Sequence, residues 1–331
     1  MKRMTMTVAA TATVLLLAAC ANSSVPPAAG QAGAGHVAVA TQAAGADLQA
    51  LTVLCKPAPE TRASHEEVDK GVASQIARPA PAPGKAFDNL YFVGAAWVSA
   101  WALKTSDGII LIDALNNAQE ASTLIEGGMK KLGLDPAEIK YIIVTHAHGD
   151  HYGGVNYLLE RYHPRVVMSQ ADWAMSEGKL EFESSQWGPP PKRDIAVKDG
   201  DAITLGDTRV TLYTTPGHTA GTISPVFDVK TGGERHRAMI WGGTAFNFGR
   251  DIPRLDSYIG ATSRMMRLAD EQNIDVMLSN HPGYDSTVPK LAQMAAPGAR
   301  GNPFVLGRPT VKRSLTVMNE CAQATRERFG A

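Results

Sequence analysis

The spacing of apolar residues predicts regular structure from about residue 87 onward. Residues 89–115 are largely apolar and are interrupted at Gly94 and at the polar turn 106–108, as expected for consecutive strands. Residues 117–132 carry apolar side chains at helical spacing and end at Gly133, which predicts a helix. Strands are also predicted at 140–146 and 165–169, around a helix at 155–162. The first half of the chain therefore alternates strands and helices.

The second half is richer in hairpins. Residues 202–219 and 224–244 each contain two apolar stretches, separated by turns at Gly206-Asp207 and Gly232-Gly233. Helices are predicted at 255–272 and 287–296 on either side of a strand at 276–281, and a last helix at 309–328. Since each layer must bury its apolar face, we expect an α/β fold of two packed sheets with helices outside.

The N-terminus indicates export. Lys2 and Arg3 precede the small and apolar run 8–19, which leads to Cys20. The stretch LLAAC at 16–20 resembles the lipobox of bacterial lipoproteins, so we expect a signal peptide at 1–19 and a lipid on Cys20. Ala21 then favours the outer membrane, with a soluble periplasmic protein as the alternative. Residues 20–60 predict a disordered tether, because they hold few large apolar groups, and residues 61–331 predict the folded domain.

Three cysteines are present in the whole sequence. If Cys20 carries lipid, Cys55 and Cys321 remain, near opposite ends of the folded part. In an oxidising periplasm they predict one disulfide, although two buried thiols are the alternative.

The charge of the chain argues against a polymeric partner. Lys plus Arg and Asp plus Glu each number 32, so the net charge is zero and no basic patch indicates nucleic acid. We therefore expect a small-molecule substrate, no nucleic acid, and membrane contact only through the lipid at Cys20.

A dense group of metal-binding residue types follows the strand at 140–146. Side chains two apart in an extended segment share a face, so His146, His148 and Asp150 can converge while His151 points elsewhere. Zinc accepts imidazole and carboxylate ligands and keeps an open position in catalytic sites. Four donors in two directions fit two metal ions better than one; hydrogen-bonded loop histidines are the alternative.

Two more donors are needed from elsewhere in the chain. His218 and His281 each lie just past an apolar strand, where a site beside a sheet is built. The other histidines lie in polar or flexible surroundings and are expected to be solvated: His36, His65, His163 and His236.

The motifs HAHGDH, TPGHT and SNHPG occur in this order and resemble the metallo-β-lactamase superfamily. The resemblance covers about residues 87–304 and implies a four-layer αββα sandwich with two zinc ions between the sheets. Three further stretches are similar to the subclass of zinc β-lactamases whose sites contain only His and Asp: NLYFVGAAWVSAWAL, GLDPAEIKYIIVTHAHGDH and NPFV. By this resemblance, the first zinc is held by His146, His148 and His218, and the second by Asp150, His151 and His281.

The resemblance implies hydrolysis by a hydroxide between the two zinc ions. This hydroxide forms at neutral pH because the zinc ions lower the pKa of the bound water to roughly 7. We expect it to open the amide of β-lactams, with Asp150 as a ligand that also orients the hydroxide. Asp113, after the strand IILID, is a candidate to orient a ligand histidine. The sequence is equally compatible with an Asp113 that only caps the loop.

Several positions depart from the resemblance. Thr244 stands where the commonest subclass has a cysteine ligand, and where the all-histidine subclass begins its substrate-binding serines. Its hydroxyl can still contact a substrate carboxylate, but Phe246 stands where a second serine is expected and cannot. Arg250 and Lys192 are candidates to bind the substrate carboxylate in place of the missing serine. Glyoxalase II-like and lactonase relatives use a bridging aspartate after this strand, where Gly243 and Thr244 stand, unless Asp256 reaches in.

The pocket and the substrate leave alternatives open. Trp97, Trp101 and Trp187, with Phe246, are candidates to wall an apolar pocket over the metals, although core packing is the alternative for Trp97 and Trp101. A second hypothesis keeps the site but changes the substrate to a lactone, an ester or another acyl bond. A third is a lipid-anchored binding protein with structural zinc.

Overall fold

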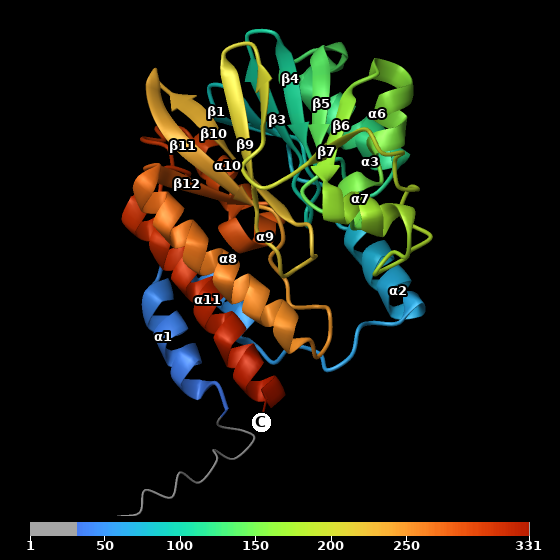
Figure 1. The fold of residues 1–331 in the computed structure, drawn as a ribbon. Coiled ribbons are helices and arrows are strands. Elements are labelled where there is room, and N and C mark those ends of the chain that lie inside the picture. Colours follow the sequence, from blue (N-terminus) through green and yellow to red (C-terminus); the bar gives the residue numbers. More distant parts are fainter. Residues whose placement is uncertain (1–31, 331) are drawn as a thin grey trace, which may run out of the picture.

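The computed structural model describes residues 32–330 of the chain. The predicted signal peptide and the lipidated Cys20 lie outside the described residues. Figure 1 shows two sheets facing each other at the centre of the fold, with helices on both outer sides. The αββα sandwich expected from the sequence is therefore confirmed.

The first sheet has seven strands in chain order. Strands β1 to β4 pair antiparallel, whereas β4 to β7 are parallel because helical segments connect them. The bounds are β1 Gly84–Phe87, β2 Leu90–Phe92, β3 Trp101–Thr105, β4 Gly108–Ile112, β5 Ile139–Ile143, β6 Arg165–Ser169 and β7 Ile195–Val197.

The second sheet has five strands in the order β12-β11-β10-β9-β8. The hairpin turns predicted at 206–207 and 232–233 join β8 to β9 and β10 to β11. Strand β12 lies parallel to β11, because α8 connects them across the outer face. The bounds are β8 Ala202–Leu205, β9 Thr208–Thr214, β10 Ile223–Thr231, β11 Glu234–Trp241 and β12 Ile274–Ser279.

Three apolar clusters hold the layers together. One lies between the sheets and joins residues such as Phe92 and Ile143 of the first sheet to Phe227 and Ile240 of the second. The others pack each sheet against its outer helices. The helical segments are α1 Ala34–Ala44, η1 Gln49–Cys55, α2 His65–Ile76, α3 Ala118–Glu120, η2 Ala121–Glu126, α4 Gly127–Lys131, η3 Pro136–Glu138, α5 Gly149–Tyr152, α6 Val155–Tyr162, α7 Gln170–Glu177, α8 Ile252–Glu271, α9 Pro282–Asp285, α10 Thr287–Ala295 and α11 Arg308–Gly330.

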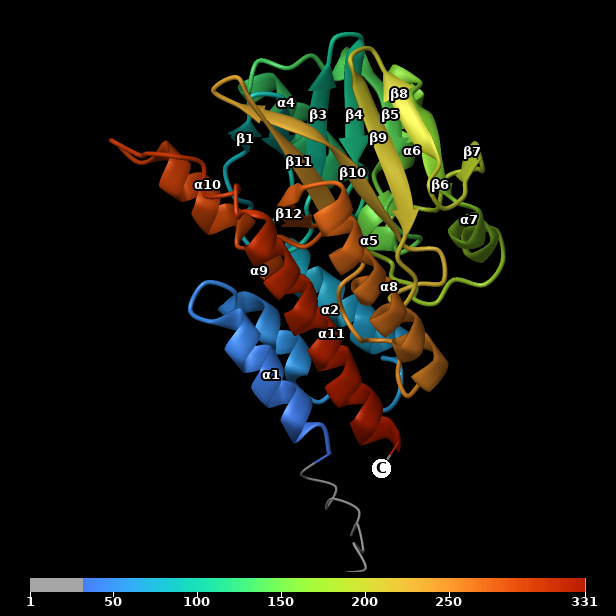
Figure 2. The same cartoon turned by 60° about the vertical axis from the view of Figure 1, so that its left-hand side comes forward.

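The disordered tether predicted for residues 20–60 is wrong for the part that the structure describes. Helix α1 packs along α11, as Figure 2 shows, and Ala40 and Ala44 are fully buried there. Alanine has the highest helix propensity, and its small side chain lets two helices approach closely. A segment poor in large apolar residues can therefore fold when another helix covers it.

A disulfide fastens this N-terminal segment to the rest of the fold. Cys55 at the end of η1 is bonded to Cys321 in α11, so the pairing expected from the sequence is present. The bond joins residues 266 positions apart, which ties η1 to the outer face of the second sheet. Within residues 32–330, no helix is long and apolar enough to cross a membrane.

Candidate metal centre

The edges of the two sheets bring the metal-binding residue types together. Strands β4 and β5 are parallel, so Asp113 and the loop with the histidine cluster emerge at the same edge. Strands β11 and β12 are also parallel, and residues 242–244 and His281 follow them in the same way. The loop between β9 and β10 adds His218. Residues from both sheets therefore meet at one end of the sandwich.

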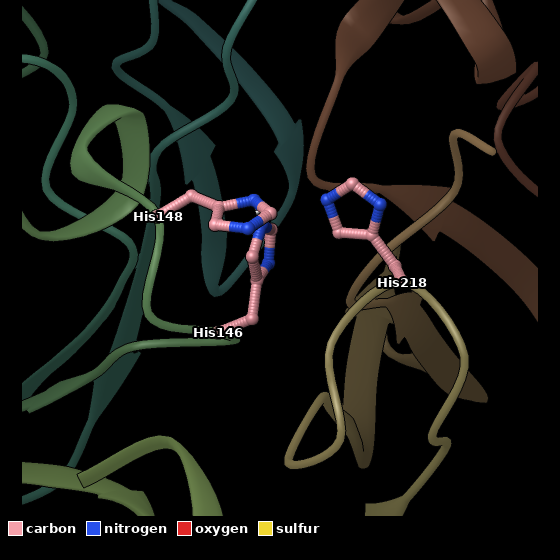
Figure 3. Close-up of side chains that lie close together, drawn as sticks. All are labelled: His146, His148 and His218. Atoms are coloured by element: carbon pink, nitrogen blue, oxygen red, sulfur yellow. Dashed lines mark hydrogen bonds between the residues drawn. The ribbon is translucent and has the colours of Figure 1, made fainter. Parts of the chain in front are cut away.

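The first cluster contains His146, His148 and His218. Each offers one nitrogen, and these three atoms lie within 4.8 Å of one another. Nε2 of His146 is 3.1 Å from Nδ1 of His148. Figure 3 shows the three rings facing one another, two from the loop after β5 and one from the opposite sheet. This is the set that the family resemblance implied for the first metal.

The second cluster contains His146, Asp150 and His151. Each offers one nitrogen or oxygen, and these three atoms also lie within 4.8 Å of one another. Nε2 of His151 lies 3.3 Å from Oδ2 of Asp150. His281 stands beside this group rather than within it, with its Nε2 3.7 Å from the same oxygen. The structure thus brings all six expected residues together, as two His/Asp clusters consistent with a dimetal site.

Hydrogen bonds fix which nitrogen of each ring faces the site. Nδ1 of His146, His218 and His281 donates to the backbone carbonyls of Gly242, Ala245 and Trp97, at 2.7, 2.8 and 2.6 Å. A carbonyl only accepts, so these nitrogens carry the proton and leave the Nε2 lone pair for a metal. Among the residues described, buried Nε2 of His151 forms no hydrogen bond; its 3.3 Å approach to Oδ2 of Asp150 is an ion-pair contact, and a nitrogen left in this state is expected of a metal ligand.

Asp113 holds the loop and one ligand at once. Its Oδ1 accepts the backbone N–H of Thr145 at 2.7 Å, and its Oδ2 accepts Nδ1–H of His151 at 2.8 Å. The two roles considered for Asp113, capping the loop and orienting a histidine, are therefore filled by one buried carboxylate.

The electrostatics of the site favour a bound cation. Burial lowers the pKa of His146 and His218, so both are neutral and able to donate a lone pair at neutral pH. Burial acts in the same direction on His151, but the carboxylates of Asp150 and Asp113 outweigh it and raise its pKa to about 10. The field that stabilises a proton on His151 also stabilises a metal cation in its place.

The remaining histidines lie away from this centre. His36 pairs with Glu320, His65 begins α2, and His163 is exposed after α6. The prediction that His236 is solvated is wrong: the residue lies in β11, 8% exposed, with Nδ1 2.7 Å from Oδ2 of Asp275.

A cleft over the metal centre contains only some of the predicted pocket residues. Trp97 and Trp187 line it, next to His148, Asp150, His218 and His281. Trp187 is anchored by its Nε1–H, which donates to Oδ1 of Asn116 at 2.9 Å, and its ring lies against Gly149, where a Cβ atom would be only 2.3 Å away. Trp101 does not line the cleft, because it packs edge-on against Phe92 and Phe304 in the core.

Thr244 and Phe246 also turn away from the cleft. Thr244 is 1% exposed and faces Ser279, while Phe246 packs against Tyr258. Ala245 and Asn247 line the cleft instead. Successive side chains in extended backbone point to opposite sides. Thr244 and Phe246 therefore face the core, whereas the residues that follow each of them, Ala245 and Asn247, face the cleft. Arg250 and Lys192 are exposed and absent from the cleft lining.

Other residues at the site were missed by sequence reasoning. Part of the cleft wall comes from α2 and the segments that flank it, including Arg62 before the helix and Arg78 after it. Glu181 contacts His148, and buried Asp172 accepts backbone N–H groups of Ala147 and Gly221 in the two ligand loops. No motif marks these positions, because their partners lie far away in sequence.

Comparisons with known proteins agree with this geometry. The family model described as "Metallo-beta-lactamase superfamily" matches residues 96–232. A hydroxyacylglutathione hydrolase of Rhodopseudomonas palustris is 32% identical over 133 residues, which is 40% of this chain and 43% of that protein. A hydroxyacylglutathione hydrolase of Francisella tularensis subsp. novicida is 36% identical over 112 residues, 34% of this chain and 36% of the relative. The chain thus matches less than half the length of these curated relatives.

Solved structures match over a longer range. BJP-1, a subclass B3 metallo-beta-lactamase of Bradyrhizobium japonicum, is 30% identical with a TM-score of 0.63, covering 73% of this chain and 92% of BJP-1. The class B3 di-zinc enzyme LRA-12 from an Alaskan soil metagenome shares the fold, at 22% identity and a TM-score of 0.60 over 77% of this chain and 95% of LRA-12. With its His/Asp clusters, the chain belongs to the metallo-beta-lactamase superfamily and is a metal-dependent hydrolase.

Proposed function

We propose that this chain uses two zinc ions to open the amide of β-lactams. The observation that carries the proposal is the match to BJP-1 over 92% of that enzyme, in a chain whose two clusters contain only His and Asp. Imidazole nitrogens and a carboxylate are ligands that zinc accepts readily. When bound, such a metal pair supplies Lewis acidity and lowers the pKa of water to about 7.

The residues of the chain supply orientation and shielding. Neighbouring histidines, against the effect of burial, hold the pKa of Asp150 well below its usual range, so this carboxylate stays ionised and can accept a hydrogen bond from the attacking water. Trp97 and Trp187 give the cleft apolar walls that exclude bulk water. His146, His148 and His218 would hold one zinc, and Asp150, His151 and His281 the other.

A second candidate is hydrolysis of a thioester or another acyl bond. The hydroxyacylglutathione hydrolases that match part of the chain favour it. Against it stands the missing bridging aspartate expected from glyoxalase II-like relatives. Asp256 does not supply it, because this half-exposed side chain pairs with Arg326 of α11. Within the described residues, Asp150 is the carboxylate that joins the metal-binding clusters.

The experiment that tests this function compares the two substrate classes on one preparation. We expect zinc-loaded protein to hydrolyse at least one penicillin, cephalosporin or carbapenem, and to lose this activity when a chelator removes the metal. Addition of zinc should restore it. Efficient hydrolysis of acyl-glutathione thioesters by protein inert to all three β-lactam classes would favour the second candidate and contradict the first.

Arg62 is the side chain we expect to bind the substrate carboxylate. It lines the cleft, and its Nε donates to the carbonyl of Phe248, which places the guanidinium beside Asn247. A hydrogen bond to a charged group contributes about 1.5–3 kcal/mol, so Arg62→Ala should raise KM for a penicillin by roughly 10-fold or more. Steady-state kinetics on the penicillin and on its methyl ester measure the effect, which should shrink for the ester.

Arg250→Ala is the matched control for this prediction, since Arg250 is exposed and lies outside the cleft. It should leave KM unchanged. If Arg62→Ala raises KM equally for the penicillin and for its methyl ester, Arg62 does not bind the substrate carboxylate.

We also propose that the protein is exported and acts at the periplasmic face of a bacterial membrane, anchored by a lipid on Cys20. The Cys55–Cys321 disulfide supports export, because such bonds persist in oxidising compartments. Labelling with radioactive palmitate, lost in a Cys20→Ala variant, tests the anchor.

A further inference from the structure

Glu181 lies in the loop after α7 and contacts both sides of the metal centre. Its Oε2 is 3.3 Å from Nε2 of His148, and the same carboxylate is paired with the guanidinium of Arg254. Arg62 adds a third contact, with a terminal nitrogen 3.2 Å from Oε1. The carboxylate is 13% exposed, so these charges meet in a largely desolvated place where a missing partner is costly.

Arg254 carries this connection to the opposite sheet. Its Nε donates to the carbonyl of Gly217 at 2.6 Å, and a terminal nitrogen donates to the carbonyl of His218. The guanidinium also stacks over the ring of Phe248, 4.4 Å from its centre. Glu181 and Arg254 together therefore join His148 of one ligand loop to the backbone of the loop that presents His218.

His148 differs from the other histidines of the centre. Those four turn Nδ1 toward an oxygen and Nε2 toward the site, whereas His148 turns Nε2 toward Glu181 and Nδ1 toward His146. A neutral imidazole carries one proton, so an acceptor at Nε2 leaves the lone pair on Nδ1. The group that accepts from Nε2 decides which nitrogen of His148 can bind a metal.

We propose that Glu181 is a positioning residue that fixes the tautomer and ring orientation of His148 and, through Arg254, its spacing from His218. The carboxylate suits this role because it accepts from Nε2 of His148 and is held in place by its ion pair with Arg254. Without this acceptor, His148 can adopt the other tautomer or rotate, and the three-histidine cluster loses its preset geometry.

The test measures metal binding and does not depend on the substrate. Metal-free wild-type protein, Glu181→Ala and Glu181→Gln are titrated with zinc in competition with a chromophoric chelator. Loss of a partner that orients a metal ligand weakens affinity by about 10–100-fold, and we expect Glu181→Ala to fall in that range. Glu181→Gln should be affected less, because its carbonyl oxygen can still accept from Nε2 of His148.

Glu126→Ala is the matched control. Glu126 is also a largely buried carboxylate, 8% exposed, that accepts from Tyr157 and pairs with Lys130 and Arg161. It lies in η2 on the outer side of the first sheet, so its loss should lower the melting temperature without changing zinc affinity. The proposal is overturned if Glu181→Ala binds zinc as tightly as wild type, or if both alanine variants lose affinity equally.

The visible spectrum of the cobalt-substituted protein gives a second readout. We expect Glu181→Ala to shift the ligand-field bands of the cobalt form, because a displaced imidazole changes the coordination geometry. Identical spectra for the wild type and Glu181→Ala would also overturn the proposal.

Discussion

Replacing His281 by alanine is expected to leave about one metal ion per chain instead of about two, and to abolish most hydrolysis. His281 follows β12 and presents Nε2 beside Asp150, held there by the bond from Nδ1 to the carbonyl of Trp97. Losing a direct ligand should cost more than the roughly 10–100-fold typical of residues that only orient ligands. Elemental analysis after dialysis, combined with activity, measures both effects. His218→Ala should remove the other metal in the same way.

His163→Ala is the control for these variants. His163 is exposed and follows α6 far from the clusters, so metal content and activity should match the wild type. His236 is unsuitable as a control because its buried bond to Asp275 makes the fold sensitive to its loss. A His281→Ala protein that retains two tightly bound metal ions would show that the second cluster is wrongly assigned.

Most of the fold could be predicted because its elements are strongly periodic or clearly bounded. The two hairpins of the second sheet have glycine-containing turns, and the helix predicted at 309–328 extends along nearly the whole of α11. The metal-binding residues were also visible, since parallel strands end at one edge and place the following residues together. These features depend on local sequence and on a simple rule of sheet topology.

The features that escaped prediction depend on side-chain direction and on distant partners. Phe246 and Asn247 are neighbours, yet one faces the core and the other the cleft. The position of α1 depends on α11, which begins more than 260 residues after α1 ends. Arg62 precedes the stretch that resembles the family, so no motif connected it with the metals. Such contacts become visible only when the tertiary structure is known.

Replacing Asp113 by asparagine is expected to remove metal from the second cluster while the fold is largely kept. Oδ1 of Asp113 accepts the backbone N–H of Thr145, which cannot reorient, so the amide oxygen of the asparagine must take this position. The amide NH₂ group then replaces Oδ2 and faces Thr145 Oγ1 and Nδ1 of His151. Nδ1 of His151 then faces a donor and must accept, which moves the ring proton to Nε2. A protonated Nε2 cannot bind a metal, so activity should fall by at least about 100-fold, as for other wrong-tautomer variants.

Asp113→Ala separates this effect from a general loss of structure. Alanine leaves the backbone N–H of Thr145 and the ring of His151 without their buried acceptor, which should lower stability by about 3–5 kcal/mol. Asparagine keeps the volume and the bond to Thr145, so its melting temperature should lie closer to the wild type although its metal loss is comparable. Elemental analysis and thermal unfolding of both variants give the two quantities. An asparagine variant with full metal content would mean that Asp113 supports the loop without selecting the tautomer of His151.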